Sequence, residues 1–129
     1  MQQVVLDSNI IIDFTRKASP LLRVLIEKSS KKEIKLLIPA VVVSELIAGQ
    51  ETREKAKKRD LEILFSKFEF IPMNYNLSMI TGELLREYRK LDLADATIAA
   101  TALNLGAKLA TRNKKDFEVI GGLKFFKLR

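Results

Sequence analysis

Short runs rich in apolar residues alternate along the chain with longer stretches of mixed polarity. Runs of this length, bounded by Gly, Pro and polar residues, are typical of strands in a sheet. They predict five strands, at residues 4–6, 36–38, 68–71, 108–111 and 123–128, the last after a turn at Gly121-Gly122.

The longer stretches predict helices between these strands. Ser19 and Pro20 are suited to begin a helix as its N-cap and first residue, and Asn76 can cap a later one. Gly49 and Gly106 are suited to end two others. Together these features predict helices at residues 20–27, 39–48, 51–65, 77–88 and 93–105.

Strands and helices therefore alternate along the sequence. A helix between two strands lets them run parallel and covers one face of the sheet. We expect an α/β fold, a three-layer α/β/α sandwich with a mostly parallel central sheet. The 129 residues and 47% hydrophobic content suit a single domain over residues 1–129.

The chain contains neither cysteine nor histidine. The lack of cysteine excludes disulfides and thiolate chemistry, and it fits a cytoplasmic protein. Without histidine, a bound metal would have only oxygen ligands and would be a hard cation such as Mg²⁺ or Mn²⁺. No apolar run approaches the ~20 residues that cross a bilayer, so we expect a soluble, unprocessed protein without a membrane segment.

The formal net charge of +7 favours a polyanionic partner such as nucleic acid. Three groups of Lys and Arg contribute to it, at residues 31–35, 55–59 and 112–115. The second group also contains Glu–Lys pairs at helical spacing, so it is better explained as a solvated helix face. Arg112 and Lys115 lie close in sequence to Asp116, an acid that follows a predicted strand, which makes contact with nucleic-acid phosphates the better explanation for them.

Two acidic residues follow predicted strands. Asp7 comes directly after the first strand and Asp116 a few residues after the fourth. Ligands of open α/β sheets bind beyond the carboxyl ends of the strands, so both residues are candidates for a site there. Each also has a purely local explanation, Asp7 as a helix N-cap and Asp116 as a turn or cap residue.

Two further acids lie on predicted helices. Glu45 belongs to a helix that is apolar on almost every side, so we expect it to be buried and either ion-paired or bound to a metal. Asp95 follows Asp92 by three residues, a spacing that resembles a capping box and gives Asp95 a local role in stabilising the helix. Either residue could instead face the edge of the sheet where Asp7 and Asp116 lie.

The four acids together suggest more than any one of them. Clustered carboxylates repel each other, and a divalent cation relieves the repulsion. Mg²⁺ or Mn²⁺ in such a cluster can polarise a phosphoryl oxygen and supply hydroxide at neutral pH. The sequence thus favours metal-dependent hydrolysis of phosphodiester bonds without histidine.

Four segments carry a family resemblance over essentially the whole chain. They are Asp7-Ser8-Asn9-Ile10, Ser44-Glu45-Leu46 with Gly49, Asp95-Ala96 with the following Ile98-Ala99-Ala100-Thr101-Ala102, and Thr111-Arg112-Asn113 with Asp116-Phe117. In order and spacing they resemble the motifs of PIN-domain proteins, and most closely those of the VapC toxins of toxin–antitoxin pairs. One departure is Ser8, where Thr is more usual, but the hydroxyl is kept.

The resemblance implies that Asp7, Glu45, Asp95 and Asp116 form the catalytic and metal-binding site. It also implies RNA cleavage, a cognate antitoxin protein as partner, and a homodimer. Thr111 and Asn113 would support Asp116 or contact a substrate phosphate, Asn9 would support the site or bind substrate, and Arg112 and Lys115 would contact substrate phosphates. For Asp13, which also matches a family acid, we expect a role in local hydrogen bonding rather than in metal binding.

Other functions remain open at this point. One is a PIN nuclease that processes RNA without a toxin role, and another is a catalytically silent PIN module that only binds. A signalling receiver domain fits poorly, because it needs a phosphorylatable Asp after the third strand, where this chain has Pro72-Met73-Asn74.

Overall fold

The fold is built around four parallel strands. The computed structural model describes residues 1–128 and places the strands in the order β3-β2-β1-β4. They are β1 (Gln2–Leu6), β2 (Ile34–Pro39), β3 (Glu69–Ile71) and β4 (Lys108–Ala110). Val5 of β1 pairs with Leu37 of β2 on one side and with Leu109 of β4 on the other. The first strand therefore lies inside the sheet, and its carboxyl end meets that of the most distant strand in sequence.

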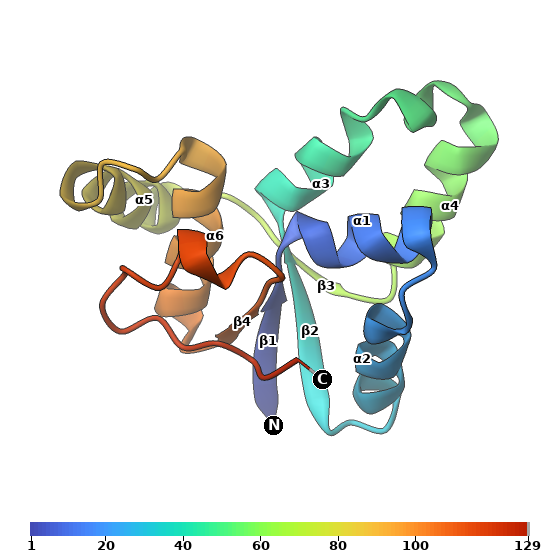
Figure 1. Cartoon of the computed structure of the whole chain (residues 1–129), viewed down its shortest axis with the longest axis horizontal. Coiled ribbons are helices and arrows are strands. Elements are labelled where there is room, and N and C mark those ends of the chain that lie inside the picture. Colours follow the sequence, from blue (N-terminus) through green and yellow to red (C-terminus); the bar gives the residue numbers. More distant parts are fainter. Residues whose placement is uncertain (129) are drawn as a thin grey trace.

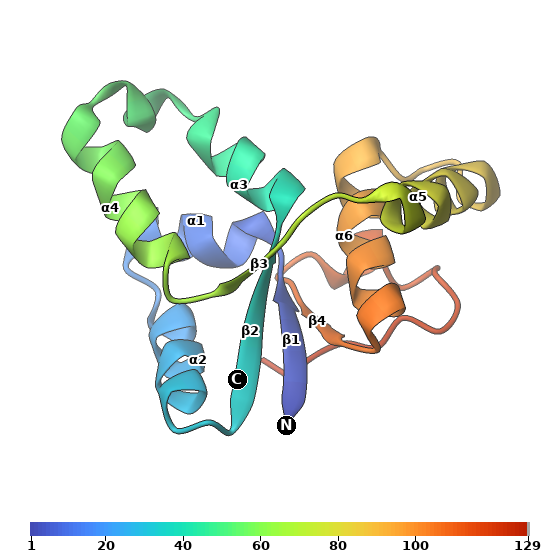
Figure 2. The same ribbon diagram turned by 180° about the vertical axis from the view of Figure 1, so that it is seen from behind.

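Helices cover both faces of this sheet. They are α1 (Ser8–Lys17), α2 (Pro20–Ser30), α3 (Ala40–Ile47), α4 (Lys55–Phe65), α5 (Tyr75–Glu87) and α6 (Leu93–Leu105), with short 3-10 helices η1 (Gln50–Arg53) and η2 (Lys114–Asp116). Figures 1 and 2 show α1 and α2 on one side of the strands and α5 and α6 on the other. This arrangement confirms the predicted three-layer α/β/α sandwich.

Helix α6 is the most deeply buried helix of the structure as described. Residues 96–102 are all buried, and four of these seven are alanine. Small side chains let the helix axis approach the sheet closely, and α6 contacts β1, β2 and β4. Its amino end, with Asp95, is thereby fixed near the carboxyl ends of the central strands.

The predicted helix ends are partly right. Ser19 caps α2 by accepting from the Leu21 amide, and Gly106 ends α6 in the left-handed conformation. The prediction for Asn76 is wrong, because Asn74 caps α5 and accepts from the Leu77 amide at 2.8 Å. Asn76 lies inside the helix, where its amide donates to Asn104 Oδ1 at 2.9 Å.

Two predicted elements are also wrong. The helix expected over residues 51–65 is broken at Glu54, whose backbone is extended and separates η1 from α4. The strand expected over residues 123–128 is reduced to one bridge between Phe125 and Leu109. The Phe126 amide donates to the Leu109 carbonyl at 2.8 Å, so this segment still covers part of the outer edge of β4.

Between residues 1 and 128 no helix is long and apolar enough to cross a membrane.

Candidate active site

Asp7 lies where the two central strands end. Its amide donates to the Ala110 carbonyl at 3.0 Å, which extends the pairing of β1 and β4 by one residue. Its side chain is 5% exposed. Oδ1 accepts from the Ser8 amide and Oδ2 from the Thr111 hydroxyl, each at 2.7 Å. Asp7 is therefore the N-cap of α1, as its local explanation requires, and also a fixed carboxylate at the end of the sheet.

Thr111 connects the loop after β4 to the start of α1. Its hydroxyl donates to Asp7 and accepts from the Asn113 amide at 3.0 Å and the Asn9 side-chain amide at 3.3 Å. Asn9 Oδ1 accepts in turn from the Arg112 amide at 3.2 Å. Three of the predicted supporting residues, Asn9, Thr111 and Asn113, thus belong to one hydrogen-bonded network that holds the Asp7 carboxylate.

Asp95 stands in the first turn of α6 without capping it. The cap is Asp92, whose Oδ1 accepts from the Asp95 amide at 2.8 Å, so the Asp95 carboxyl is not used to satisfy the helix end. Burial raises the pKa of Asp95 to about 6, and the negative charges of Asp92, Asp7, Asp116 and Glu45 add to the rise. The charge of Asp95 is therefore influenced by all three other candidate acids.

Glu45 is exposed, although the sequence predicted that it would be buried. Only Val42 and Leu46 of α3 are buried, because the helix projects beyond the sheet and packs along one face, and Glu45 is exposed. Within residues 1–128 no Lys or Arg forms an ion pair with it. Partial desolvation of the carboxyl group raises the pKa of Glu45, as do the charges of Asp7 and Asp92, while the Ser8 hydroxyl opposes the rise. The expectation of a buried glutamate is wrong, but the charge of Asp7 still raises the pKa of Glu45, and the charge of Glu45 raises the pKa of Asp95.

Asp116, at the end of η2, is the fourth candidate acid. It ends η2, where its amide donates to the Asn113 carbonyl at 3.0 Å, and it is exposed. Its negative charge raises the pKa of both Asp7 and Asp95. For Asp7 the largest cause of the raised pKa is burial, which the hydrogen bonds from Thr111 and Ser8 oppose. We call Asp7, Glu45, Asp95 and Asp116 the carboxylate cluster.

The carboxylate cluster offers oxygen ligands only. Among residues 1–128 no three acidic side chains converge closely enough to hold one metal ion together in this structure. Mg²⁺ needs no such cage, because it keeps several waters and is held by one or two carboxylates together with substrate phosphate. The donor chemistry and the mutual repulsion of the acids therefore fit Mg²⁺ or Mn²⁺, with Asp7 as the most firmly held of the four.

The basic residues near the cluster differ in their surroundings. Arg112 Nε lies 2.9 Å from Asp13 Oδ2, so Asp13 forms an ion pair rather than joining the cluster. Lys115 is exposed on η2, and Lys114 lies over the ring of Phe125, 5.1 Å from its centre. Of the two predicted substrate contacts, Lys115 forms no ion pair in the described part of the chain. Arg112 is paired with Asp13 through Nε only.

One acid near the cluster was missed as a site residue. Asp92 appeared in the sequence only as the first member of a capping pair, and it does cap α6. Its charge also raises the pKa of Asp95 and Glu45. The capping spacing was the one sequence feature that pointed to its position, and nothing in that spacing indicates a second, electrostatic role.

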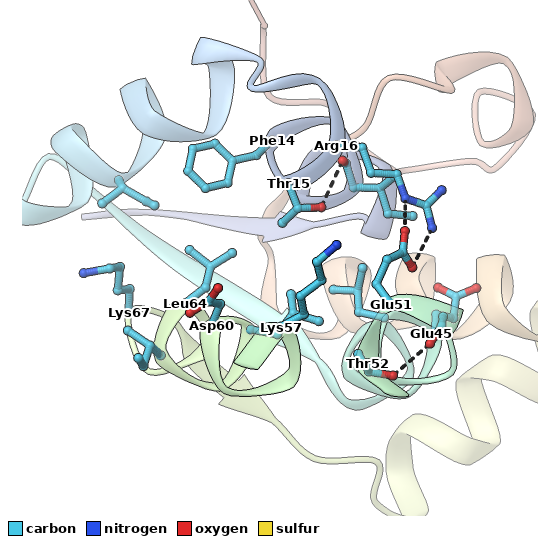
Figure 3. Close-up of a pocket in the computed structure, with 16 residues that line it drawn as sticks. Phe14, Thr15, Arg16, Glu45, Glu51, Thr52, Lys57, Asp60, Leu64 and Lys67 are labelled. Carbon is cyan, nitrogen blue, oxygen red and sulfur yellow. Dashed lines mark hydrogen bonds and ion pairs between the residues drawn. The ribbon is translucent and has the colours of Figure 1, made fainter. Parts of the chain in front are cut away.

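A groove of about 740 Å³ runs from Glu45 between helices α1 and α4. Figure 3 shows Phe14 and Arg16 of α1 on one side and, on the other, Leu64 of α4 and Lys67, which follows that helix. Its charged lining residues are three basic and three acidic ones, Arg16, Lys57, Lys67, Glu45, Glu51 and Asp60. We call it the α1–α4 groove.

Comparison with known proteins gives consistent matches. The family model described as PIN domain matches residues 4–123. A tRNA(fMet)-specific endonuclease VapC from Shigella flexneri is 30% identical, over 96% of this chain and 96% of its own length. Ribonuclease VapC10 from Mycobacterium tuberculosis is 33% identical, over 74% of this chain and 73% of its own length.

Solved structures share the fold. VapBC2 from Rickettsia felis, bound to a DNA fragment from their promoter, superposes with a TM-score of 0.86 at 24% identity, over 99% of this chain and 100% of that one. A toxin–antitoxin complex from Klebsiella pneumoniae gives a TM-score of 0.70 at 27% identity, over 93% of this chain and 94% of that one.

Proposed function

Because this chain belongs to the PIN-domain family and is a ribonuclease of the VapC type, we propose that it cuts RNA with Mg²⁺ or Mn²⁺ at the carboxylate cluster. The observation that supports this site best is the raised pKa of Asp95, to which Asp7, Asp116 and Glu45 all contribute. Acids from four separate segments repel each other there, and a divalent cation favours their ionised forms. We further propose that residues 1–129 act as one nuclease domain, in the cytoplasm.

Each side chain has a definite part in this proposal. A bound divalent cation would neutralise charge on the phosphate and lower the pKa of water. Asp7 would hold it, because Thr111 and Ser8 fix that carboxylate in one orientation. Asp95, Asp116 and Glu45 would complete the site from α6, η2 and α3, and Lys115 and the free part of the Arg112 guanidinium would contact phosphates of the substrate.

The test is cleavage of RNA by the purified chain with Mg²⁺, with Mn²⁺ and with excess EDTA. Asp7→Asn and Glu45→Gln should each lower the rate at least about 100-fold, since each removes a charge that would hold the ion. Glu83→Gln, an exposed change on α5, is the control and should keep the wild-type rate. Cleavage that continues unchanged in EDTA would contradict the metal-dependent mechanism.

We propose a toxin–antitoxin role with the α1–α4 groove as the docking site of the antitoxin. Structures of the same fold include VapBC and other toxin–antitoxin complexes. The balanced charges and apolar floor of the groove suit an amphipathic protein segment better than a polyanion. Because Glu45 lines the groove, a segment bound in it would lie against the carboxylate cluster and hinder the approach of RNA.

We also propose a homodimer, formed through an apolar edge made of Phe70, Met73, Tyr75 and Met79. All four side chains are exposed, Tyr75 by 81%. Phe70 lies on β3, an edge strand of the sheet, and Tyr75 and Met79 are one helical turn apart at the start of α5. Exposed apolar side chains that gather in one segment are typical of subunit interfaces.

A further inference from the structure

A second groove lies between helix α2 and the segment that follows η2. It has a volume of about 630 Å³ and is lined by one side of α2 from its N-cap Ser19 to Lys28, by Thr111 and Arg112, and by residues 126–128. In Figure 1 this last segment crosses in front of the sheet toward α2. Thr111 both lines the groove and donates to Asp7, so the groove begins one hydrogen bond away from the carboxylate cluster.

We infer that this groove binds single-stranded RNA on one side of the bond that is cut. The inference rests on the proposed ribonuclease function and adds the path of the substrate. The charged side chains that line the groove within residues 1–128 are Lys28, Arg112 and Lys127, all basic. The α1–α4 groove is lined by equal numbers of basic and acidic side chains, so the two grooves differ in net charge and should bind different kinds of partner.

Arg112 can serve the groove although it is already paired. Asp13 engages its Nε atom at 2.9 Å, and the Arg112 side chain is still 50% exposed. The ion pair fixes the guanidinium plane and leaves the two terminal nitrogens as donors for a phosphate. Lys28 and Lys127 are exposed and add two flexible positive charges along the groove.

The rest of the lining favours unpaired nucleotides. Leu21, Val24 and the ring of Phe126 provide an apolar surface beside the basic side chains. Bases of a single strand can stack on such a surface, whereas the bases of a duplex are already stacked and paired. Ser19 Oγ accepts from the Leu21 amide and keeps only its hydroxyl proton for a ligand, so the groove should bind mainly through phosphates and stacking.

The inference is tested by binding of a labelled, mixed-sequence 12-nucleotide RNA to the full chain in EDTA, where it is not cut. Lys28→Ala and Lys127→Ala should each weaken binding about 3- to 10-fold at low salt. For the double variant, a plot of log association constant against log salt concentration should be less steep by about 1.4, because each contact to a single strand contributes about 0.7 to the slope. Lys31→Ala, which removes an exposed charge at the end of the same helix but outside the groove, should change the affinity less than 2-fold.

Two outcomes would overturn the inference. One is a double variant with the affinity and salt slope of Lys31→Ala. The other is equal affinity of wild type for the single strand and for the same sequence as a duplex. A wild-type chain that fails to cut RNA with Mg²⁺ or Mn²⁺ would contradict the proposed function instead. A weaker salt dependence in the double variant would still support the groove as a binding site.

Discussion

Single residues decide how the carboxylate cluster behaves without a metal, and Asp95 gives the clearest case. Its pKa is about 6 in the folded chain against 3.8 for an unperturbed group. The folded state therefore binds more protons than the unfolded state between about pH 4 and 6, and stability falls as pH rises through that window. In EDTA, Asp95→Asn should match wild type near pH 4 and become more stable by about 1 kcal/mol at pH 7.5, a figure that allows for solvent screening.

Thermal melts at the two pH values measure this difference, and Asp92, which supplies the cap, is unchanged in the variant. Added Mn²⁺ should then raise the melting temperature of wild type by mass action and that of Asp95→Asn much less. A variant that is destabilised at pH 7.5, responds to Mn²⁺ like wild type and still cuts RNA would show that Asp95 takes no part in metal binding or catalysis.

Thr111 is a second single residue with a testable effect, because its hydroxyl positions the Asp7 carboxylate. Its hydrogen bond lowers the pKa of Asp7, so Thr111→Val should raise that pKa further and shift the acidic limb of the cleavage–pH profile to higher pH. The buried carboxylate also loses a donor, which should cost about 1–3 kcal/mol of stability. Thr111→Ser keeps the hydroxyl and should restore both properties. A Val variant with lower stability but an unmoved pH profile would show that Thr111 supports only the fold.

Among the elements, α4 carries the proposed antitoxin contact. Ile63 is 55% exposed and lines the α1–α4 groove. Ile63→Lys should abolish copurification of the antitoxin and leave RNA cleavage intact, because the side chain supports neither the core nor the carboxylate cluster. Val119→Lys changes a residue of similar exposure, 62%, outside the groove and should still copurify the partner. Equal loss in both variants would argue against the groove as the docking site.

The elements also show what the sequence can predict. Local chemistry was often sufficient: Ser19, Gly106 and four of the five apolar runs located helix ends and strands correctly, although Asn74 rather than Asn76 caps α5. It failed where packing decides. The apolar character of α3 suggested burial all round, yet this helix extends beyond the sheet and leaves Glu45 exposed. The mixed segment 123–128 has strand-forming residues, but the three-residue β4 offers it a single bridge.

The candidate site was predictable as a set of acids, and its supporting contacts were not. Asp7 and Asp116 could be located because each follows a strand. The network of Thr111 with Asn9 and the pairing of Arg112 with Asp13 join residues about a hundred positions apart, and no periodicity records such contacts. The assignment of catalytic roles to these residues stays a prediction until the variants are measured.

At the scale of the whole molecule, the proposed homodimer depends on the exposed apolar edge of β3 and α5. Tyr75→Lys and Met79→Lys introduce charges on an exposed helix face, so folding should be unaffected and self-association lost. Light scattering behind size exclusion should give a dimer mass for wild type and a monomer mass for the double variant. The control is Leu105→Lys, a change of an exposed apolar residue at the end of α6. A wild-type monomer at micromolar concentration would contradict the proposed dimer.

The position of β1 inside the sheet bears on when the enzyme becomes active during its own synthesis. Asp7 leaves the ribosome early, but Thr111, its hydrogen-bond donor, lies 104 residues later. At typical elongation rates those residues take roughly 5 to 20 s to make. During that interval β1 lacks its β4 neighbour and Asp116 does not yet exist, so the nascent chain cannot hold a complete carboxylate cluster. By the proposed mechanism, the growing chain should not cut RNA until nearly all of its fold has emerged.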